Sequence, residues 1–238
     1  MDRPLPDRYA TRTRCQVTEG KKQIGVILSG CGYLDGSEIQ EAVLVLLAID
    51  EAGAQARLFA PDGTLAEVDH RTGKANGKER SIIEEGARLA RGKIADLASV
   101  GGADVDGWVL PGGYGAAKNL SDVASKGAGA TVNKEVGRVL REALSAQIPV
   151  GACCIAPMVV AAVAKQVNAK LRLTIGNDVD TAKQIAAMGH AHVVCAVDDV
   201  VVDADRKVVT SPAYMYDASI AEVSRGIAKM VRQVVAWA

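Results

Sequence analysis

Apolar residues along the chain gather in short runs, and longer segments with helical spacing separate them. Several of the short runs are rich in β-branched side chains, a pattern typical of buried strands. The predicted strands span residues 23–29, 54–60, 106–111, 148–152, 171–175 and 192–197, followed by a hairpin over 200–203 and 207–210. The predicted helices span residues 38–51, 81–91, 133–146, 178–188 and 218–237, together with one that begins at Pro157. Residues 61–80 hold several turn signals and predict a loop or a small hairpin.

Strands and helices that alternate in this way predict an α/β sandwich with a mostly parallel, doubly wound sheet and right-handed crossovers. Ligands in such sheets bind beyond the carboxyl ends of the strands. Three segments follow strands directly: the loop 30–37, the glycine-rich segment 111–119 and a turn at Cys154. We therefore expect a site where these three segments meet.

Residues 148–164 contain no charged side chain. They do not predict a membrane-spanning helix, which needs about 20 unbroken apolar residues, because two prolines and a glycine interrupt them. They predict instead a buried strand, a sharp turn at Cys153 and Cys154, and a helix with Pro157 in its first turn, where a missing N–H group does no harm.

A thiol at such a strand-to-helix elbow lies at the positive end of a helix dipole, which favours the thiolate. The N–H group of the next residue is then free to bind an oxyanion. Cys154 is the preferred tip of the elbow because it abuts the helix, whereas Cys153 belongs to the strand. The alternative is that both cysteines are small core residues, and the three converging loops favour Cys154 as a nucleophile.

Two glutamates at the start of the helix 38–51 are candidate proton carriers for the thiol. Glu38 and Glu41 are three residues apart and share a helix face. Glu38 is preferred because it is nearest the preceding loop, where Ser37 is expected to cap the helix. A glutamate buried near a thiol should have a raised pKa and be able to shuttle a proton. The alternative is that both residues are acidic only because the helix dipole favours negative charge there.

Backbone N–H groups next to the elbow would form an oxyanion hole. Gly112 and Gly113 follow a predicted strand and would supply one donor opposite Ile155, although such a pair also occurs in ordinary tight turns. Neither neighbour of Cys154 is a histidine, so the Cys-His pair used for amide hydrolysis is not supported.

Several other polar residues are secondary candidates. His192 would be part of the site only if the fold places its strand next to Cys154. His70 and His190 are expected in solvated or structural roles. Asn177 and Asp178 follow a predicted strand and would reach the rim of the site. Cys31 is either a resolving thiol for Cys154 or a small loop residue.

Composition and charge narrow the class of protein. The 238 residues include 28 basic and 28 acidic side chains, so no net charge attracts nucleic acid or an anionic membrane. We expect one domain over residues 23–238 after a flexible arm, residues 1–22. Five cysteines without regular spacing indicate neither a disulfide framework nor a zinc site. The arm has no apolar secretory segment, which predicts a cytoplasmic location with an organelle matrix as the alternative.

The sequence resembles the PfpI-type branch of the class I glutamine amidotransferase-like superfamily, and in detail its ElbB/ES1-type, glyoxalase-like subfamily. The resemblance covers residues 23–236. It is carried by the segments IGVILSGCG (24–32), DGSEI (35–39), LPGGYGAAKNL (110–120), CIAP (154–157), LRLTIGND (171–178) and VTSPAY (209–214).

The resemblance implies a flavodoxin-like sandwich in which Cys154 is the elbow nucleophile and a first-helix glutamate, Glu38 or Glu41, is hydrogen-bonded to it. It also implies oxyanion N–H groups from Gly113 and Ile155. Proteases and amidotransferases of the superfamily carry a histidine where this chain has Ile155 or the segment 176–177, so neither activity is expected.

With protease and amidotransferase activity set aside, the resemblance implies glyoxalase-like chemistry without metal, glutathione or other cofactor. Cys154 would add to a small α-oxoaldehyde such as methylglyoxal or glyoxal and release a hydroxy acid. The rival hypothesis is a non-catalytic redox-sensing or protein-protective module in which Cys154 is oxidised reversibly. A homodimer is expected by analogy with relatives, with an apolar surface on the last helix available for it; that helix places Ile220, Val223, Ile227, Met230 and Val234 on one face.

Overall fold

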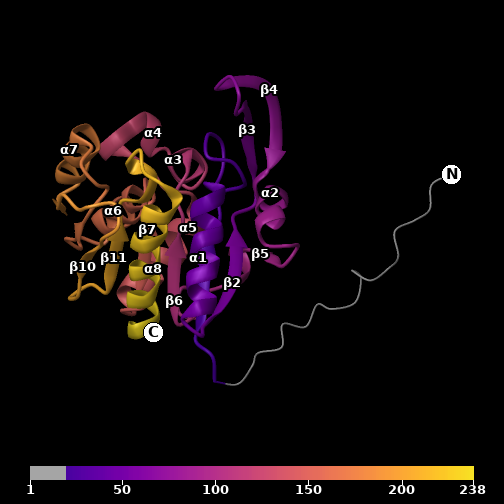
Figure 1. Cartoon of the computed structure of the whole chain (residues 1–238). Coiled ribbons are helices and arrows are strands. Elements are labelled where there is room, and N and C mark those ends of the chain that lie inside the picture. Colours follow the sequence, from indigo (N-terminus) through magenta and orange to yellow (C-terminus); the bar gives the residue numbers. More distant parts are fainter. Residues whose placement is uncertain (1–19) are drawn as a thin grey trace.

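The computed structural model describes residues 20–238. Most of the predicted arm, residues 1–19, lies outside this range. A central sheet has the strand order β10-β11-β7-β6-β1-β2-β5 (Figure 1), and only the pair β10–β11 is antiparallel. Its strands are β1 (Gln23–Ile27), β2 (Gln55–Ala60), β5 (Ile94–Asp96), β6 (Gly107–Leu110), β7 (Val150–Cys153), β10 (Val201–Asp203) and β11 (Val208–Ser211).

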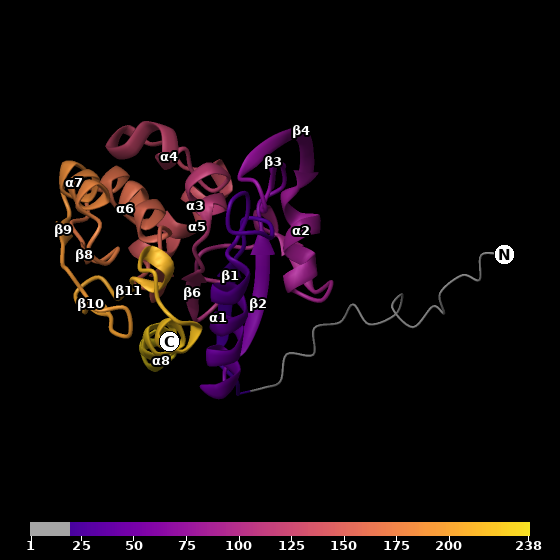
Figure 2. The same cartoon turned by 45° about the horizontal axis from the view of Figure 1, so that its top comes forward.

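Helices cover both faces of this sheet (Figure 2). One face carries the first and last helices, and the other carries helices from the middle of the chain. The helices are α1 (Ile39–Glu51), α2 (Ile82–Leu89), α3 (Tyr114–Lys118), α4 (Val123–Lys126), α5 (Lys134–Ser145), α6 (Pro157–Gln166), α7 (Val179–Ala187) and α8 (Ile220–Trp237). The predicted three-layer α/β sandwich with a mostly parallel sheet is confirmed.

Successive residues of the central strands point into different cores, because side chains alternate along a strand. In β6, Trp108 and Leu110 pack with α5 and α6, whereas Val109 packs with α1 and α8. All three are fully buried. This double burial explains why the strands appear in the sequence as uninterrupted apolar runs.

The segment that was expected to be a loop or a hairpin is a hairpin. β3 (Thr64–Asp69) pairs antiparallel with β4 (Lys74–Ser81) in a separate two-stranded sheet. In Figure 1 this hairpin stands beside the loop that follows β1, at the end of the sheet where the parallel strands finish.

Three predicted features differ in the structure. The strands predicted over residues 171–175 and 192–197 shrink to β8 (Arg172–Leu173) and β9 (Ala191–His192), which pair only with each other. β8 ends there because the N–H of Thr174 turns to the hydroxyl of Thr210, 2.9 Å away, so residues beyond His192 have no strand to continue along. In α8, Ile220 is 50% exposed, so it is not part of the buried face of the helix, unlike Val223.

Candidate active site

A strand-to-helix elbow lies at the centre of the sheet. Strand β7 ends at Cys153, which is fully buried, and Cys154 follows with a φ of 59° before α6 begins at Pro157. The N–H of Cys154 donates to the carbonyl of Ser211 at 3.0 Å, which ties the turn to β11. A positive φ is uncommon outside glycine and is found preferentially at functional sites. Cys154 is therefore the tip of the elbow, as the sequence indicated.

The carboxyl group that meets this elbow belongs to Glu41. Its side chain is fully buried. Oε2 accepts the N–H of Gly112 at 2.8 Å and Oε1 accepts the N–H of Tyr214 at 3.2 Å. The Cys154 thiol hydrogen-bonds the same carboxyl group, and the sulfur of Cys153 lies 3.8 Å from Oε2. Three segments distant in the sequence thus converge on one glutamate.

Burial gives Glu41 an unusual pKa. Desolvation of the carboxylate, aided by the negative charge of Glu38, raises the pKa from 4.5 to about 7. The hydrogen bonds from Tyr214, Gly112 and Cys154 oppose this shift because they stabilise the charged form. A group that titrates near neutral pH can both accept and return a proton.

Glu38, the residue preferred from the sequence, has a different place. It is the N-cap of α1, and its Oε2 accepts the N–H of Glu41 at 2.6 Å. Ser37 is not the cap, because its hydroxyl accepts the N–H of Ser29 at 2.9 Å inside the preceding loop. Burial raises the pKa of Glu38, while N–H groups of the first helical turn lower it. The structure thus puts Glu41, and not Glu38, beside the Cys154 thiol, and Glu38 on the wall of the adjacent cleft.

The expectation that Cys154 rests as a thiolate is wrong. Burial, followed by the negative charge of Glu41, raises the pKa of the Cys154 thiol well above its ordinary value. The N–H groups of Gly113 and Ile155 act in the opposite direction but do not prevail. The side chain is only 8% exposed. The resting group is a thiol, and a nucleophilic attack from it requires that its proton leave at the same time.

Glycine is required at both positions of the expected oxyanion donor pair. Gly113 has a φ of 93°, and a Cβ there would collide with backbone atoms of the loop before α1. A Cβ on Gly112 would lie 2.6 Å from Oε2 of Glu41 and 3.0 Å from Sγ of Cys154. The N–H groups of Gly113 and Ile155 face the sulfur, whereas the N–H of Gly112 is occupied by Glu41.

A cleft of about 800 Å³ opens over Cys154. This volume lies within the ordinary range for small-molecule sites. Besides Cys154, its wall is formed by Glu38, Gly113 and Ile155, by three tyrosine side chains, and by residues of α4, α6 and α7. The tyrosines are Tyr33, Tyr114 and Tyr214.

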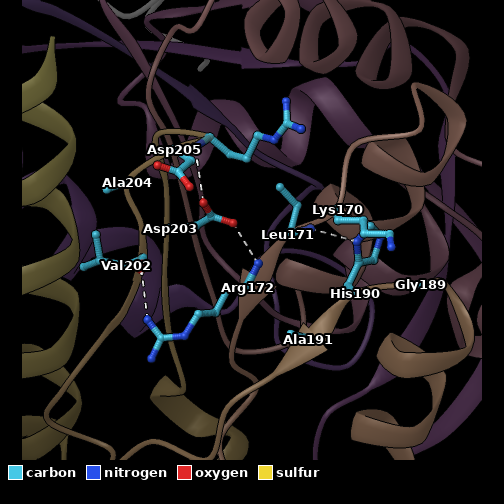
Figure 3. Close-up of a pocket in the computed structure, with 11 residues that line it drawn as sticks. Lys170, Leu171, Arg172, Gly189, His190, Ala191, Val202, Asp203, Ala204 and Asp205 are labelled. Carbon is cyan, nitrogen blue, oxygen red and sulfur yellow. Dashed lines mark hydrogen bonds between the residues drawn. The ribbon is translucent and has the colours of Figure 1, made fainter.

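A second hollow, of about 700 Å³, lies among β8, β9 and β10 (Figure 3). Several of its polar groups are engaged with one another. Asp203 accepts the backbone N–H of Arg172 at 2.8 Å, and buried His190 accepts the N–H of Leu171 at 3.2 Å. No cysteine lines this hollow, so the cleft at Cys154 is the better candidate.

The three histidines have structural contacts. His190 contacts the carbonyl of Ala161 at 2.8 Å in addition to its bond from Leu171, and His192 accepts the N–H of Ile175 at 3.4 Å. His70 lies on the β3–β4 hairpin. Neither His192 nor Asn177 is part of the cleft wall, but Asp178 is. Among the residues described, no group of three metal-ligating side chains is found.

Cys31, the candidate resolving thiol, does not line the cleft. Burial, together with the charge of Glu85, raises the pKa of its thiol. Tyr214 was not among the candidates from the sequence; its backbone N–H donates to Glu41, and the residue lines the cleft. The segment 209–214 was part of the family resemblance, and its place directly after a strand was the available signal.

The strand order, the elbow and the glycine pair after β6 define a class I glutamine amidotransferase-like domain. The fold matches a crystal structure described as an isoprenoid biosynthesis protein with amidotransferase-like domain from Ehrlichia chaffeensis. The TM-score is 0.85 and the identity 38%, over 91% of this chain and 99% of that one. Drosophila melanogaster DJ-1beta, at a TM-score of 0.55 and 19% identity, shares the fold.

Sequence comparison gives the family. The chain is 39% identical to the rat ES1 protein homolog, mitochondrial, over 98% of this chain and 92% of that protein. It is 42% identical to the human glutamine amidotransferase-like class 1 domain-containing protein 3, mitochondrial, over 90% and 82%. No protein-family model matches the chain. The chain belongs to the ES1 family of class I glutamine amidotransferase-like proteins. Over residues 20–238, no helix is both long and apolar enough to cross a membrane.

Proposed function

We propose that the protein is a glyoxalase-like enzyme that converts small α-oxoaldehydes to hydroxy acids without glutathione. The observation that carries the proposal is the contact between the Cys154 thiol and a buried carboxyl group of pKa about 7. The cleft beside this pair is large enough for a small carbonyl compound. The resting thiol makes Glu41 essential, because the carboxylate must take the proton as sulfur attacks.

In the first step, Glu41 accepts the thiol proton while Sγ of Cys154 bonds to the aldehyde carbon. The carbonyl electron pair moves to oxygen, and the N–H groups of Gly113 and Ile155 bind the resulting oxyanion. The oxyanion then takes the proton from Glu41, which leaves a hemithioacetal and a carboxylate. Backbone donors suit this step because they are fixed before the reaction begins.

In the second step, the Glu41 carboxylate removes the hydrogen on the former aldehyde carbon as a proton, and the electron pair moves to the ketone oxygen to give an enediolate. Glu41 then returns the proton to the former ketone carbon, while the hydroxyl proton on the former aldehyde carbon passes to the neighbouring oxygen. The product is a thioester of a 2-hydroxy acid. Water then cleaves the C–S bond, releasing the acid and restoring the thiol. Methylglyoxal and one water thus give lactate with no external oxidant or reductant. Glu38, on the cleft wall, keeps negative charge near Glu41 and supports its raised pKa.

The test is formation of lactate from methylglyoxal, with no glutathione present, by the full chain and by four variants. Cys154→Ala should reduce turnover to the uncatalysed rate, whereas Cys31→Ala, at a residue that does not line the cleft, should retain it. Glu41→Gln should behave like Cys154→Ala, and Glu38→Gln should retain a substantial fraction. Lactate formation that survives Cys154→Ala would refute the mechanism.

The rival, reversible oxidation of Cys154 for redox sensing, is less favoured by the geometry. Oxidation by peroxide follows thiolate character, and burial and Glu41 oppose the thiolate. Mass spectrometry after mild peroxide treatment separates the two proposals. Sulfinic acid on Cys154 at low peroxide, together with no turnover of aldehyde, would support the redox role.

Location and assembly also remain proposals. The two relatives described above carry the word mitochondrial in their names, which supports the organelle-matrix alternative over the cytoplasm.

For a homodimer, the expected apolar face of α8 is not available, because Val223 and Ile227 are fully buried in the core. The exposed apolar side chains of α1, Val43 and Leu47, are the available substitute. Sedimentation velocity of the wild type and of Leu47→Glu tests this assembly.

A further inference from the structure

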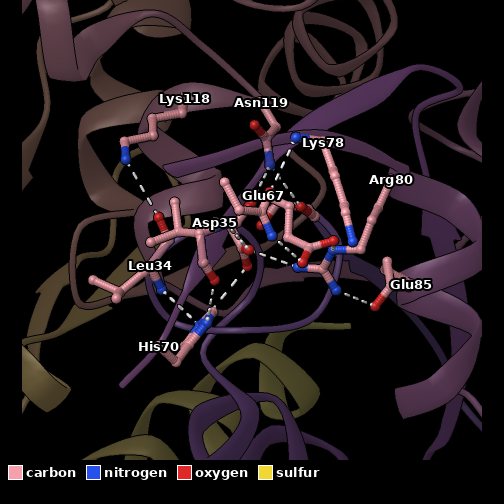
Figure 4. A network of polar contacts seen from close by, with 12 residues as sticks. Leu34, Asp35, Glu67, His70, Lys78, Arg80, Glu85, Lys118 and Asn119 are labelled. Atoms are coloured by element: carbon pink, nitrogen blue, oxygen red, sulfur yellow. Dashed lines mark hydrogen bonds and ion pairs between the residues drawn. The ribbon is translucent and has the colours of Figure 1, made fainter. Parts of the chain in front are cut away.

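A buried aspartate connects the β3–β4 hairpin to the loop that precedes α1 (Figure 4). The side chain of Asp35 is fully buried. Its Oδ2 pairs with Nη2 of Arg80 at 2.6 Å and accepts the N–H of Val68 at 2.9 Å, and both partners belong to the hairpin. The other oxygen, Oδ1, has no hydrogen-bond partner among the described residues and lies 3.8 Å from Nε2 of His70.

Arg80 is held in place by further acidic groups. Nη1 contacts Glu85 of α2 at 2.6 Å, and Nε lies 3.4 Å from Glu67 of β3. The guanidinium group therefore joins three elements: the hairpin, α2 and the loop. A planar group that donates in several fixed directions holds its partners in a defined geometry.

The loop that Asp35 secures is connected by its backbone to the candidate site. The carbonyl of Tyr33 accepts the N–H of Tyr114 at 2.7 Å, and the carbonyl of Gly36 accepts the N–H of Gly115 at 2.9 Å. These bonds hold the first turn of α3, just after the oxyanion donor Gly113. Asn119 fixes the same loop by donating to the carbonyl of Asp35 at 2.8 Å.

The same loop also sets the start of α1. Its last residue precedes Glu38, whose N–H donates to the carbonyl of Gly112 at 3.0 Å, and Glu38 caps the helix that carries Glu41. The position of the buried carboxyl group relative to Cys154 thus depends on where the loop lies. A continuous series of contacts leads from Arg80 to the sulfur.

We propose that Arg80 and Asp35 form a positioning pair for the candidate active site. Through this pair the β3–β4 hairpin holds the loop 30–37, and the loop holds Glu41 and the Gly113 N–H group around Cys154. The hairpin, which contributes no residue to the cleft wall, is then part of the machinery that sets reactivity. The proposal uses the site of the proposed function but not its substrate.

The experiment measures the rate at which iodoacetamide alkylates Cys154 as a function of pH, by mass spectrometry of the peptide that contains it, in the full chain. Turnover of methylglyoxal is measured in parallel. The variants are Arg80→Gln, Asp35→Asn and the double substitution. Arg88→Gln is the matched control, because Arg88 also pairs with Glu85, at 3.1 Å, but its side chain is 69% exposed and it does not pair with Asp35.

We expect Arg80→Gln to loosen the loop and admit water to Glu41, which lowers the pKa of the carboxyl group that takes the thiol proton. The rise of the alkylation rate that follows ionisation of Glu41, near pH 7 in the wild type, should therefore move toward lower pH. Turnover should fall by up to about 10²-fold, the loss typical of a misplacement of about 1 Å. Arg80→Lys should restore part of both readouts. Asp35→Asn should have the same effect as Arg80→Gln, and the double variant should be no worse than either, because the two residues act as one unit.

An unchanged pH profile in both Arg80→Gln and Asp35→Asn, with folding confirmed by circular dichroism, would overturn the proposal, and so would an equal effect of Arg88→Gln. If Arg80→Gln does not fold, Asp35→Asn alone is compared with the wild type, because the Asp35→Asn substitution leaves no buried carboxylate without a partner. If the wild type does not turn over methylglyoxal, the proposed function fails, and the alkylation profiles alone still decide the role of the pair.

Discussion

Replacing Glu41 with glutamine should change how stability depends on pH. The folded protein holds the proton of Glu41 up to about pH 7, whereas the unfolded chain releases it near 4.5. Between these values the folded state binds more protons, so the free energy of unfolding falls as pH rises, and above about pH 7 this contribution is constant. At 1.36 kcal/mol for each pH unit, the loss due to Glu41 is about 3 kcal/mol.

The assay is urea unfolding of the wild type and of Glu41→Gln at intervals from pH 4.5 to pH 8. Glutamine offers one acceptor oxygen, so it cannot accept both N–H groups that Glu41 accepts. This defect should cost about 1 to 3 kcal/mol at every pH, and the informative quantity is therefore the slope. Between pH 4.5 and pH 8, the free energy of unfolding should therefore fall much less in the variant than in the wild type.

The control is Glu84→Gln, on the exposed side of α2, which should keep the wild-type slope. If Glu41→Gln declines with pH as steeply as the wild type, then Glu41 does not carry a raised pKa. The mechanism based on its proton transfer would lose its physical basis as well.

Three further substitutions test other parts of the structure. Gly113→Ala should destabilise the protein by more than about 1 kcal/mol, because of its positive φ and the crowded loop, and should slow alkylation of Cys154 as measured by mass spectrometry. Ser219→Ala removes the capping box formed with Glu222 at the start of α8, and urea unfolding should show a loss of about 1 kcal/mol with turnover unchanged. Trp108→Ala should cost about 3 to 5 kcal/mol in the same measurement, since the ring is fully buried and its N–H donates to Gly102.

The order of the main elements and the place of the site were predictable because they depend on local patterns. Strands buried on both faces leave apolar runs such as the one that ends at Leu110, and the ends of parallel strands must meet at one edge. The tip of the elbow followed from Pro157, since a proline in a first turn fixes where the helix starts. These features need no knowledge of tertiary contacts.

The choice between Glu38 and Glu41 was not predictable, because it depends on which residue caps α1. Ser37 is a good capping residue by its chemistry, but a hydrogen bond to Ser29 within the loop uses its hydroxyl. The cap therefore moves to Glu38, and the helix turns Glu41 toward the elbow. A contact between residues eight positions apart thus decided which carboxyl group reaches the sulfur.

The protonation state of Cys154 was missed for a related reason. The helix dipole is visible in the sequence, but the burial of the thiol and the neighbouring carboxylate appear only in the folded chain. Desolvation outweighs a dipole that contributes about 1 kcal/mol or less at an exposed site. The short strand β5, with three residues, was missed because an isolated apolar residue does not define a pattern. The exposure of Ile220 was missed because helical spacing places it on the apolar face, and only the folded chain shows which part of that face is covered.

The contacts of Glu41 also bear on how the protein folds. Its hydrogen bonds reach partners 71 and 173 residues away in the sequence, so they close some of the longest loops in the chain. Contacts of high sequence separation are costly in entropy and tend to form late. In a partly folded chain that lacks these contacts, Cys154 would have no buried carboxyl group beside it and would react as an ordinary thiol. The change in reactivity of this one sulfur would mark completion of folding.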